Sequence, residues 1–334
     1  MANLTRDFFI ALSNNELLNE SAKKWGFRLG AEQFVGGVNV DEAIASVKEL
    51  NNKGISCTVD NLGEFVTEKS ESTAAKEKIL LLIEKIHSEQ VDCHVSVKLT
   101  QLGLDIDEAF CLANMQEIVD AASQYNIFIN IDTEDYLHYE QTMRVLDALL
   151  EDYSNVGTVI QTYFFQAEDD VDRLSDVRLR IVKGAYKESP EVAYQTKEEI
   201  DANFLKIVKK RLKGDAFTSI ATHDHNIINE VKRFVEIEGI DKSTFEFQML
   251  YGFRIDMQES LAKEGFLFCT YVPFGDDWYG YFMRRLAERP QNLNLIIKDK
   301  LYTENNKLKT APKVVVGTIA TVTALTYLCS RKKK

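Results

Sequence analysis

Two patterns of apolar residues alternate along the chain. Short runs rich in β-branched and aromatic residues, typical of strands, are separated by longer segments whose apolar residues recur at helical spacing. The short runs predict eight strands: Ile55–Asp60, Cys93–Leu99, Ile127–Asp132, Val156–Tyr163, Arg178–Lys183, Thr218–Thr222, Phe245–Leu250 and Leu267–Val272. The longer segments predict helices such as Lys76–Glu89, Asp107–Gln124, Tyr139–Asp152, Glu198–Lys213 and Asn226–Glu238. Strands that alternate with helices pair in parallel through helical crossovers.

Eight such units predict an α/β fold that closes into a single distorted (β/α)8 barrel of the TIM type. An open, doubly wound sheet is the alternative, but no G-x-G-x-x-G follows any predicted strand. The four prolines and the lack of a Gly/Ser-rich linker favour one domain. We expect a helical N-terminal cap at residues 1–50, a catalytic barrel at 51–300, and an apolar, basic-ended tail at 311–334 that forms a C-terminal helix.

Composition narrows the class of protein. Apolar residues make up 45% of the chain and charged residues 28%, which is ordinary for a soluble globular protein. The net charge is −12, and because Arg331–Lys334 are all basic, the rest of the chain carries −16. An acidic body has no electrostatic footprint for nucleic acid, so we expect no such partner.

Cysteine usage and the N-terminus indicate the compartment. The five cysteines are odd in number, far apart and without a C-x-x-C pair, so they predict a reducing compartment and no cysteine-based metal site. We therefore expect no bound metal. The first residues show no basic segment followed by an apolar stretch, so no secretory signal is evident and a cytoplasmic location is expected.

Polar residues gather where the predicted strands end, which in a (β/α)8 barrel is where the active site lies. Taken singly, such a lysine is commonly an ion-paired surface group, and such a tyrosine a core aromatic. Seven of the eight strand ends, however, carry cations, amides or carboxylates in a chain that is otherwise acidic. This convergence predicts an active site. The residues include Lys98, Asp132, Gln161, Arg180, Lys183, Thr222, His223, Gln248 and Tyr271.

Several of these residues stand in longer motifs that follow one another in a fixed order. They are Val97-Lys98-Leu99-Thr100, Ile131-Asp132-Thr133-Glu134, Val159-Ile160-Gln161-Thr162-Tyr163, Leu179-Arg180-Ile181-Val182-Lys183-Gly184-Ala185-Tyr186, Ala221-Thr222-His223, Phe245-Glu246-Phe247-Gln248-Met249-Leu250 and Arg284-Arg285-Leu286-Ala287-Glu288. In these motifs, from about Gly36 to Arg289, the chain resembles the flavin-dependent proline dehydrogenases in their short monofunctional bacterial form.

The resemblance implies a function and its partners. A distorted (β/α)8 barrel would hold FAD above the strand ends, and L-proline would lie against one face of the flavin. A hydride would pass from proline C5 to flavin N5 and yield 1-pyrroline-5-carboxylate, the first step of proline catabolism to glutamate. The electrons would then pass to a membrane quinone.

The resemblance also assigns roles to residues. Asp132 and Arg180 would be catalytic, with the Arg180 cation beside flavin N5 to stabilise the reduced ring. Gln161 would bond the pyrimidine edge of the flavin. The other residues that would contact FAD are Thr133, Lys183, Gly184, Ala185, Thr222 and His223.

Substrate binding would fall mainly to two arginines. Arg284 and Arg285 would bind the proline carboxylate, because a guanidinium offers paired donors that match it. Lys98 and Glu288 would complete an ion-pair shell, and the Lys98, Arg284 and Arg285 cations would disfavour the ammonium form of the substrate. The remaining residues that would shape the pocket are Tyr186, Leu250 and Tyr271.

The C-terminal tail has two interpretations. Val314–Cys329 is uncharged and precedes the basic residues Arg331–Lys334. Its sixteen residues would span about 24 Å as a helix, whereas a crossing needs roughly 20 residues. A tail anchor or interfacial helix on the inner face of the cell membrane is one interpretation, because a terminal basic cluster favours an anionic leaflet. An apolar helix docked on the barrel is the other.

Two rival functions come from other classes. A metal-dependent barrel hydrolase could use His223 and His225, which share one face of a strand, together with Asp132 or Glu134. A non-enzymatic, membrane-associated scaffold would use the barrel only for binding, but it leaves the convergence of cations at the strand ends unexplained.

Overall fold

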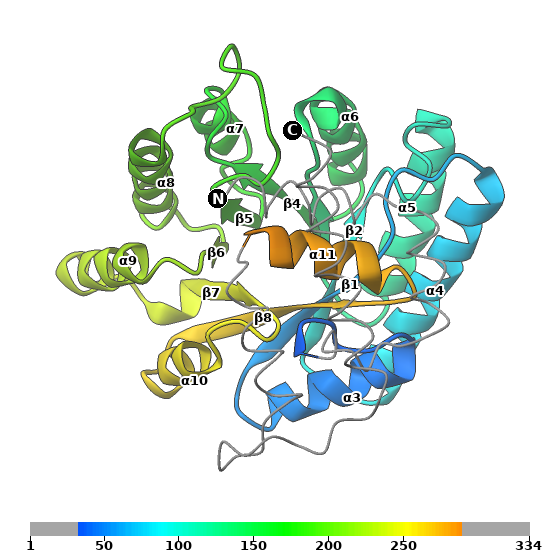
Figure 1. Ribbon diagram of the computed structural model, residues 1–334, viewed down its shortest axis with the longest axis horizontal. Helices are drawn as coiled ribbons and strands as arrows, with labels where there is room; N and C mark the ends of the chain where they lie inside the picture. Colours follow the sequence, from blue (N-terminus) through cyan, green and yellow to red (C-terminus); the bar gives the residue numbers. More distant parts are fainter. Residues whose placement is uncertain (1–32, 289–334) are drawn as a thin grey trace, which may run out of the picture. The chain divides into compact units, whose positions relative to one another are not determined.

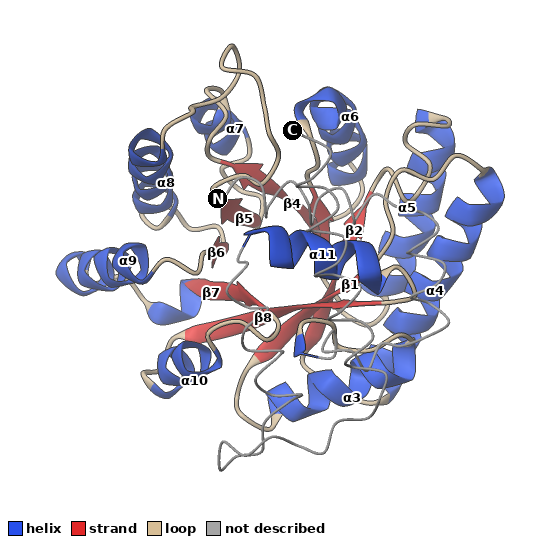
Figure 2. Ribbon diagram, in the orientation of Figure 1, coloured by secondary structure: helices blue, strands red, loops and turns tan. Residues whose placement is uncertain are grey.

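The barrel predicted from the sequence is confirmed. The computed structural model describes residues 33–288, with side chains described as far as Met283. Eight parallel strands close into one barrel in chain order, and β1 pairs with both β2 and β8 (Figures 1 and 2). The strands are β1 (Ser56–Asn61), β2 (Cys93–Lys98), β3 (Ile129–Asp132), β4 (Val156–Gln161), β5 (Leu179–Val182), β6 (Thr218–Ala221), β7 (Phe245–Leu250) and β8 (Leu267–Phe274).

Helices alternate with the strands and surround the barrel, as Figure 1 shows for α3 to α10. They are α3 (Val40–Asn51), α4 (Lys69–Ser88), α5 (Glu108–Ser123), α6 (Tyr139–Leu150), α7 (Ala167–Arg173), α8 (Lys197–Arg211), α9 (His225–Glu238) and α10 (Ile255–Lys263). Two short 3-10 helices are η3 (Tyr136–His138) and η4 (Lys242–Thr244). A further helix, α11 (Trp278–Glu288), falls mostly in a separate compact unit and is described only by its bounds.

The strands alternate between two environments. On β2, Val95 and Val97 are fully buried in the apolar core between the strands and the helices. Ser96 and Lys98, between and after them, contact side chains from strands that are not neighbours of β2, so they face the inside of the barrel. The interior is therefore polar towards the carboxyl ends of the strands, where the sequence predicts the active site.

Helix caps fix the loops that carry candidate site residues. Thr196 and Glu199 form a capping box at the start of α8. The Asp224 side chain accepts hydrogen bonds from two backbone N–H groups at the start of α9, and α9 ends at Gly239 in the left-handed conformation, with φ 66°. Because Asp224 caps α9, the helix begins two residues after His223, at His225.

The predicted elements differ from the observed ones mainly at helix starts. All eight predicted strands are present, and none of their ends differs by more than two residues. Helix α4 begins at Lys69 instead of Lys76, because its first turns are mostly polar and apolar periodicity does not mark them. Helices α7 and α10, of seven and nine residues, complete the alternation.

Parts of the expected organisation fall outside the described residues. Most of the N-terminal cap predicted at 1–50 lies there, although its last part forms α3. The tail predicted at 311–334 also lies outside. Within residues 33–288, none of the helices combines the length and the apolar character needed to cross a membrane.

Candidate active site

Asp132, the last residue of β3, accepts hydrogen bonds from three side chains. Arg180 Nη1 of β5 lies 2.5 Å from Oδ1, and Asn130 Nδ2 lies 3.0 Å from the same oxygen. Tyr271 Oη of β8 donates to Oδ2 at 2.8 Å. The carboxylate is buried and oriented from both sides, so it joins β3, β5 and β8 at the carboxyl end of the barrel.

Lys98, the last residue of β2, is the second cation of the cluster. Its Nζ lies 2.8 Å from Asp60 Oδ2, 3.7 Å from Asp132 Oδ2 and 3.3 Å from Tyr271 Oη. Burial alone would lower the pKa of Lys98, but Asp60, Tyr271 and Asp132 together raise it well above its ordinary value. Lys98 is therefore a largely buried ammonium, 12% exposed at its side chain, that stays charged.

Arg180 is held by the inner wall of the barrel. Its Nη2 donates to Ser96 Oγ at 2.9 Å and to Thr58 Oγ1 at 3.4 Å, and its guanidinium carbon lies 5.2 Å from the centre of the Tyr271 ring. Nε of Arg180 is buried and has no hydrogen-bond partner among the described residues. A buried donor without a partner is costly, so this atom is suited to a polar ligand.

Three more polar groups lie at the ends of β3 and β4. Gln161 Nε2 donates to the backbone oxygen of Glu134 at 2.7 Å, which orients the amide. The carboxylate of Glu134 accepts hydrogen bonds from the backbone N–H and the hydroxyl of Thr100. Burial raises the pKa of Glu134 to about 7. The Thr133 hydroxyl is buried without a partner in the part of the chain that is described.

The loop after β5 begins with Lys183 and Gly184. Lys183 Nζ lies 2.5 Å from Asp201 Oδ1 and 3.3 Å from Asp224 Oδ2. Gly184 has φ 123°, and a Cβ there would lie 2.5 Å from the Tyr163 ring. Glycine is required at this position both by its backbone conformation and by the closeness of the ring.

Of the remaining predicted site residues, some have described side chains and others do not. Ala185 is exposed in the loop after β5, and the neighbouring Tyr186 is half-buried, with a pKa that burial raises. Leu250 ends β7. Arg284, Arg285 and Glu288 belong to α11, but their side chains are outside the described residues, so their roles stay predictions. The main cluster thus joins Lys98, Asp132, Arg180 and Tyr271.

The two histidines of the hydrolase hypothesis do not form a metal site. Nε2 of His223 accepts the backbone N–H of Leu250 at 3.1 Å, whereas His225 lies on α9 and pairs with Asn229. Among the described residues, neither belongs to a group of three His, Cys, Asp or Glu side chains that could share an ion. The structure therefore does not support the metal-dependent hydrolase.

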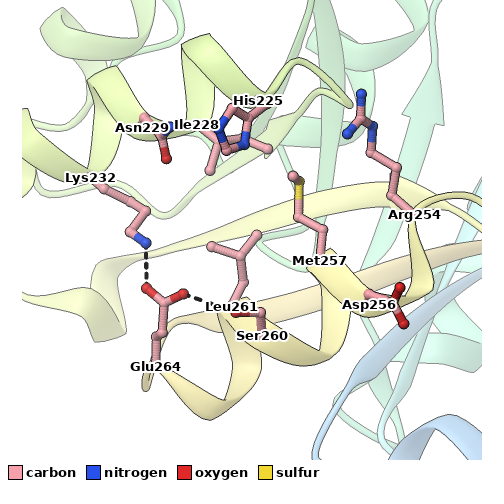
Figure 3. A pocket seen from close by; sticks show the side chains of 10 residues that line it. All are labelled: His225, Ile228, Asn229, Lys232, Arg254, Asp256, Met257, Ser260, Leu261 and Glu264. Atoms are coloured by element: carbon pink, nitrogen blue, oxygen red, sulfur yellow. Dashed lines mark hydrogen bonds and ion pairs between the residues drawn. The ribbon is translucent and has the colours of Figure 1, made fainter.

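The groove between α9 and α10 is separate from this cluster. It has a volume of about 480 Å³ and is lined by residues such as His225, Arg254 and Met257, with a Lys232–Glu264 ion pair across it (Figure 3). None of the residues predicted from the sequence for FAD or proline lines it. The polar cluster at the strand ends, rather than this groove, is therefore the candidate active site.

Four residues that contact the Lys98–Asp132–Arg180–Tyr271 cluster were not predicted from the sequence. Asp60, Thr58, Ser96 and Asn130 contact Lys98, Arg180 or Asp132 directly, yet none was among the predicted site residues. One signal was available for Asp60, because it is a charged residue at the end of an apolar predicted strand. The others are small polar residues within strands. Closure of the barrel brings Thr58 and Ser96 to Arg180, whereas Asn130 lies two residues before Asp132 on β3.

The fold has relatives among solved structures. The proline utilization A protein of Bdellovibrio bacteriovorus, in a crystal structure inactivated by N-propargylglycine, superposes with a TM-score of 0.76 at 23% identity. That match covers 88% of this chain and 38% of the other. The same type of protein from Bradyrhizobium japonicum gives a TM-score of 0.67 at 21% identity, covering 77% of this chain and 30% of that one. At these identities the likeness establishes the fold.

The family of the chain follows from its sequence relatives. Proline dehydrogenase 2 of Bacillus subtilis is 42% identical over 297 residues, which is 88% of this chain and 98% of that protein. The proline dehydrogenase of Deinococcus radiodurans is 40% identical over 286 residues, or 84% and 91% of the two chains. The model of the family described as proline dehydrogenase matches residues 43–296, which hold every strand of the barrel and the whole Lys98–Asp132–Arg180–Tyr271 cluster. On this basis the chain belongs to the proline dehydrogenase family.

Proposed function

We propose that this chain oxidises L-proline to 1-pyrroline-5-carboxylate with FAD as its cofactor, and that the electrons then pass to a membrane quinone. The observation that carries the proposal is the cluster of Lys98, Asp132, Arg180 and Tyr271 at the carboxyl ends of the strands. Lys98, Asp132 and Arg180 also stand in the sequence motifs in which the chain resembles the family. The cluster supplies charged donors and acceptors that are already oriented by the protein.

The residues present fit a flavin dinucleotide. Two buried polar groups have no hydrogen-bond partner among the described residues, Nε of Arg180 and the hydroxyl of Thr133. Both could form hydrogen bonds to a polar ligand. Because Gln161 donates to Glu134 through Nε2, its carbonyl oxygen is oriented to accept a hydrogen bond. When bound, FAD supplies the acceptor for the hydride that leaves proline C5.

Five further positions would hold the same cofactor. Lys183 brings a positive charge suited to phosphate, and Gly184 and Ala185 allow a close approach of backbone. Thr222 and His223, directly before α9, would contact the ribityl and adenosine side. Asp201 and Asp224, which pair with Lys183, keep its Nζ in a defined position.

The chain's own residues would bind and orient proline. Arg284 and Arg285 would hold the carboxylate through paired guanidinium donors, and Glu288 would pair with them. Tyr186, Leu250 and Tyr271 would enclose the ring, and Tyr271 is fixed by its hydrogen bond to Asp132. The hydride leaves most readily when the amine is unprotonated, so the site must release the amine proton to solvent before transfer.

The decisive experiment is a spectrum of the purified protein before and after anaerobic addition of proline. A yellow protein whose flavin absorbance bleaches with proline supports the proposal, because no other redox group is expected. Bound FAD that stays oxidised in excess proline would contradict the assignment of the substrate. A purified protein that binds no flavin would contradict the assignment of the cofactor.

The quinone and the membrane need a second experiment. Deleting residues from Ala311 onward should leave FAD content and proline:dye activity nearly unchanged, but should move the protein from the membrane fraction to the soluble one. Val314–Cys329 supplies apolar area and Arg331–Lys334 roughly 1 kcal/mol per cation near an anionic surface. If the full-length and shortened proteins partition alike in a flotation assay, the tail does not anchor the protein. A docked helix predicts lower thermal stability instead.

A further inference from the structure

A second polar cluster lies inside the barrel, closer to the amino ends of the strands. It consists of His94 on β2, Glu246 on β7 and Cys269 on β8, and all three are buried. Strand β2 is not a neighbour of β7 or β8, so these side chains meet across the barrel interior. His94 precedes Lys98 by four positions on β2, and the proposed reaction uses none of the three.

Each side chain offers one atom that can bind a metal ion. The ligand atoms, a ring nitrogen of His94, a carboxylate oxygen of Glu246 and Sγ of Cys269, all lie within 4.8 Å of one another. In the described part of the chain, no hydrogen bond is formed by the ring nitrogens of His94, by Sγ of Cys269 or by Oε2 of Glu246. Three donor atoms of different strands therefore lie close together without hydrogen bonds to the described residues, which is the arrangement that a bound ion requires.

The other oxygen of Glu246 is already engaged. Oε1 accepts hydrogen bonds from Ser219 Oγ at 2.6 Å, Gln248 Nε2 at 2.6 Å and Arg178 Nη2 at 3.1 Å. These bonds orient the carboxylate and leave Oε2 for another partner. Outer hydrogen bonds of this kind are typical of carboxylates that bind metals.

The charges of the cluster fit a divalent cation. Burial, together with Arg178 and Arg180, lowers the pKa of His94 well below its ordinary value, so the imidazole is neutral and its lone pair is available. Burial and Glu246 raise the pKa of Cys269, so without a metal it is a thiol. Loss of that proton on binding would give two negative charges, one thiolate and one carboxylate.

Two nearby cations, Arg178 and Arg180, oppose a bound cation, and Arg180 is paired with Asp132. Arg178 bears a positive charge, but it is paired with Glu246 and lies between the Phe128 and Phe217 rings, 4.3 and 4.4 Å from their centres. Its positive charge is therefore balanced in part by the Glu246 carboxylate. A weakly bound, purely electrostatic ion is excluded by these neighbours, whereas an ion that forms a strong bond to sulfur is not.

We propose that His94, Glu246 and Cys269 bind a zinc-type divalent ion inside the barrel. A mixed set of nitrogen, oxygen and sulfur donors is typical of Zn²⁺, with water as the fourth ligand. Binding forms a metal–sulfur bond, breaks the S–H bond of Cys269 and releases one proton to solvent. The ion ties β2, β7 and β8 together, and its role is to stabilise the barrel.

The proposal departs from what the sequence predicts. The absence of a C-x-x-C pair predicts no cysteine-based metal site. That rule covers ligands close together in sequence, whereas here each ligand comes from a different strand and closure of the barrel brings them together.

The test uses the full-length protein with its flavin. After treatment with a chelator, the protein is titrated with Zn²⁺ or Co²⁺, and bound metal per chain, the visible spectrum of the Co²⁺ form and the Tm are measured. We expect one ion per chain, a cobalt–thiolate absorption band, and a higher Tm with Zn²⁺. The cobalt band reports sulfur ligation in the wild-type protein, so this result does not depend on any variant folding.

Variants then identify the ligands. Cys269→Ser and His94→Gln should weaken binding roughly tenfold or more, and Cys269→Ser should abolish the cobalt–thiolate band. Cys111→Ser is the matched control, because Cys111 is also a buried thiol but lies on α5, against the Leu99 carbonyl. A wild-type protein that takes up no ion overturns the proposal. So does equal binding, with the same cobalt band, in the Cys269→Ser variant.

Discussion

Replacing Asp60 with asparagine tests whether the interior cluster depends on its charge balance. Asp60 and Asp132 bring two negative charges, and Lys98 and Arg180 bring two positive ones. Asparagine has the same shape and still offers Lys98 a carbonyl oxygen as acceptor. The substitution therefore removes one charge and leaves a net positive charge buried in the barrel.

The distances give the size of the effect. With an effective dielectric constant of 20, the attraction of Lys98 to Asp60 at 2.8 Å is about 6 kcal/mol, and to Asp132 at 3.7 Å about 4.5 kcal/mol. The larger of the two attractions is lost, although part of it only offsets the cost of burying the ions. Because the hydrogen bond survives, we expect a loss of about 3 kcal/mol, at the lower end of the range for breaking a buried pair.

The assay is thermal and denaturant unfolding of the protein. A loss of about 3 kcal/mol corresponds to a fall in Tm of roughly 6–12 °C for a domain of this size. Adding Lys98→Met to Asp60→Asn removes the unpaired charge and should recover part of the stability. The control is Glu89→Gln, which breaks the exposed pair with Lys48 and should cost less than about 1 kcal/mol. The reasoning is refuted if Asp60→Asn lowers the free energy of unfolding no more than Glu89→Gln does, and if the double variant is no more stable than Asp60→Asn. The stability of the cluster would then not depend on its charge balance.

Four other predictions test the site. Arg180→Met should slow flavin reduction by proline in rapid mixing more than it weakens proline binding, and a wild-type rate would exclude the role beside the flavin. Arg285→Lys should retain FAD but weaken proline binding by about 2 kcal/mol, seen as a higher KM, because lysine lacks paired donors; an unchanged KM would contradict this. Gly184→Ala, which introduces strain at φ 123°, should cost about 1 kcal/mol or more and reduce FAD retention, whereas Gly214→Ala should do neither. Burial raises the pKa of Glu134 to about 7, so the folded protein keeps a proton on this group that the unfolded chain loses above pH ~4.5. The free energy of unfolding should therefore fall as the pH rises from ~4.5 to about 7. Glu134→Gln should flatten this fall in denaturant titrations, and an equal slope in the variant would assign it to another group.

The fold could be predicted because its signal is local. Each strand is a run of β-branched and aromatic residues, and eight such runs separated by helical segments leave few topologies. The start of α4 was missed for a local reason as well, since Lys69–Ala75 lacks apolar periodicity. Boundaries therefore depend on details that the pattern of apolar residues does not carry.

The candidate site could be predicted only in part, because its contacts are not local. Strand ends pointed to Lys98, Asp132, Arg180 and Tyr271, and these four residues do meet. Their partners Thr58 and Ser96 are ordinary strand residues in the sequence. They become part of the site because alternate residues of β1 and β2 face inward at the level of Arg180.

The charges of the cluster also change how the cations act on proline. From the sequence, Lys98 together with Arg284 and Arg285 would disfavour the ammonium form of the substrate. In the structure, Lys98 is paired with Asp60 and Asp132, and Arg180 with Asp132, so two carboxylates balance the two cations. A neutral cluster exerts little net field on a nearby amine. In the proposed reaction, the preference for the unprotonated amine would then come from desolvation of the substrate and from Arg284 and Arg285. The pH dependence of kcat/KM should therefore shift more in Arg285→Gln, which removes a cation, than in Arg285→Lys, which keeps one.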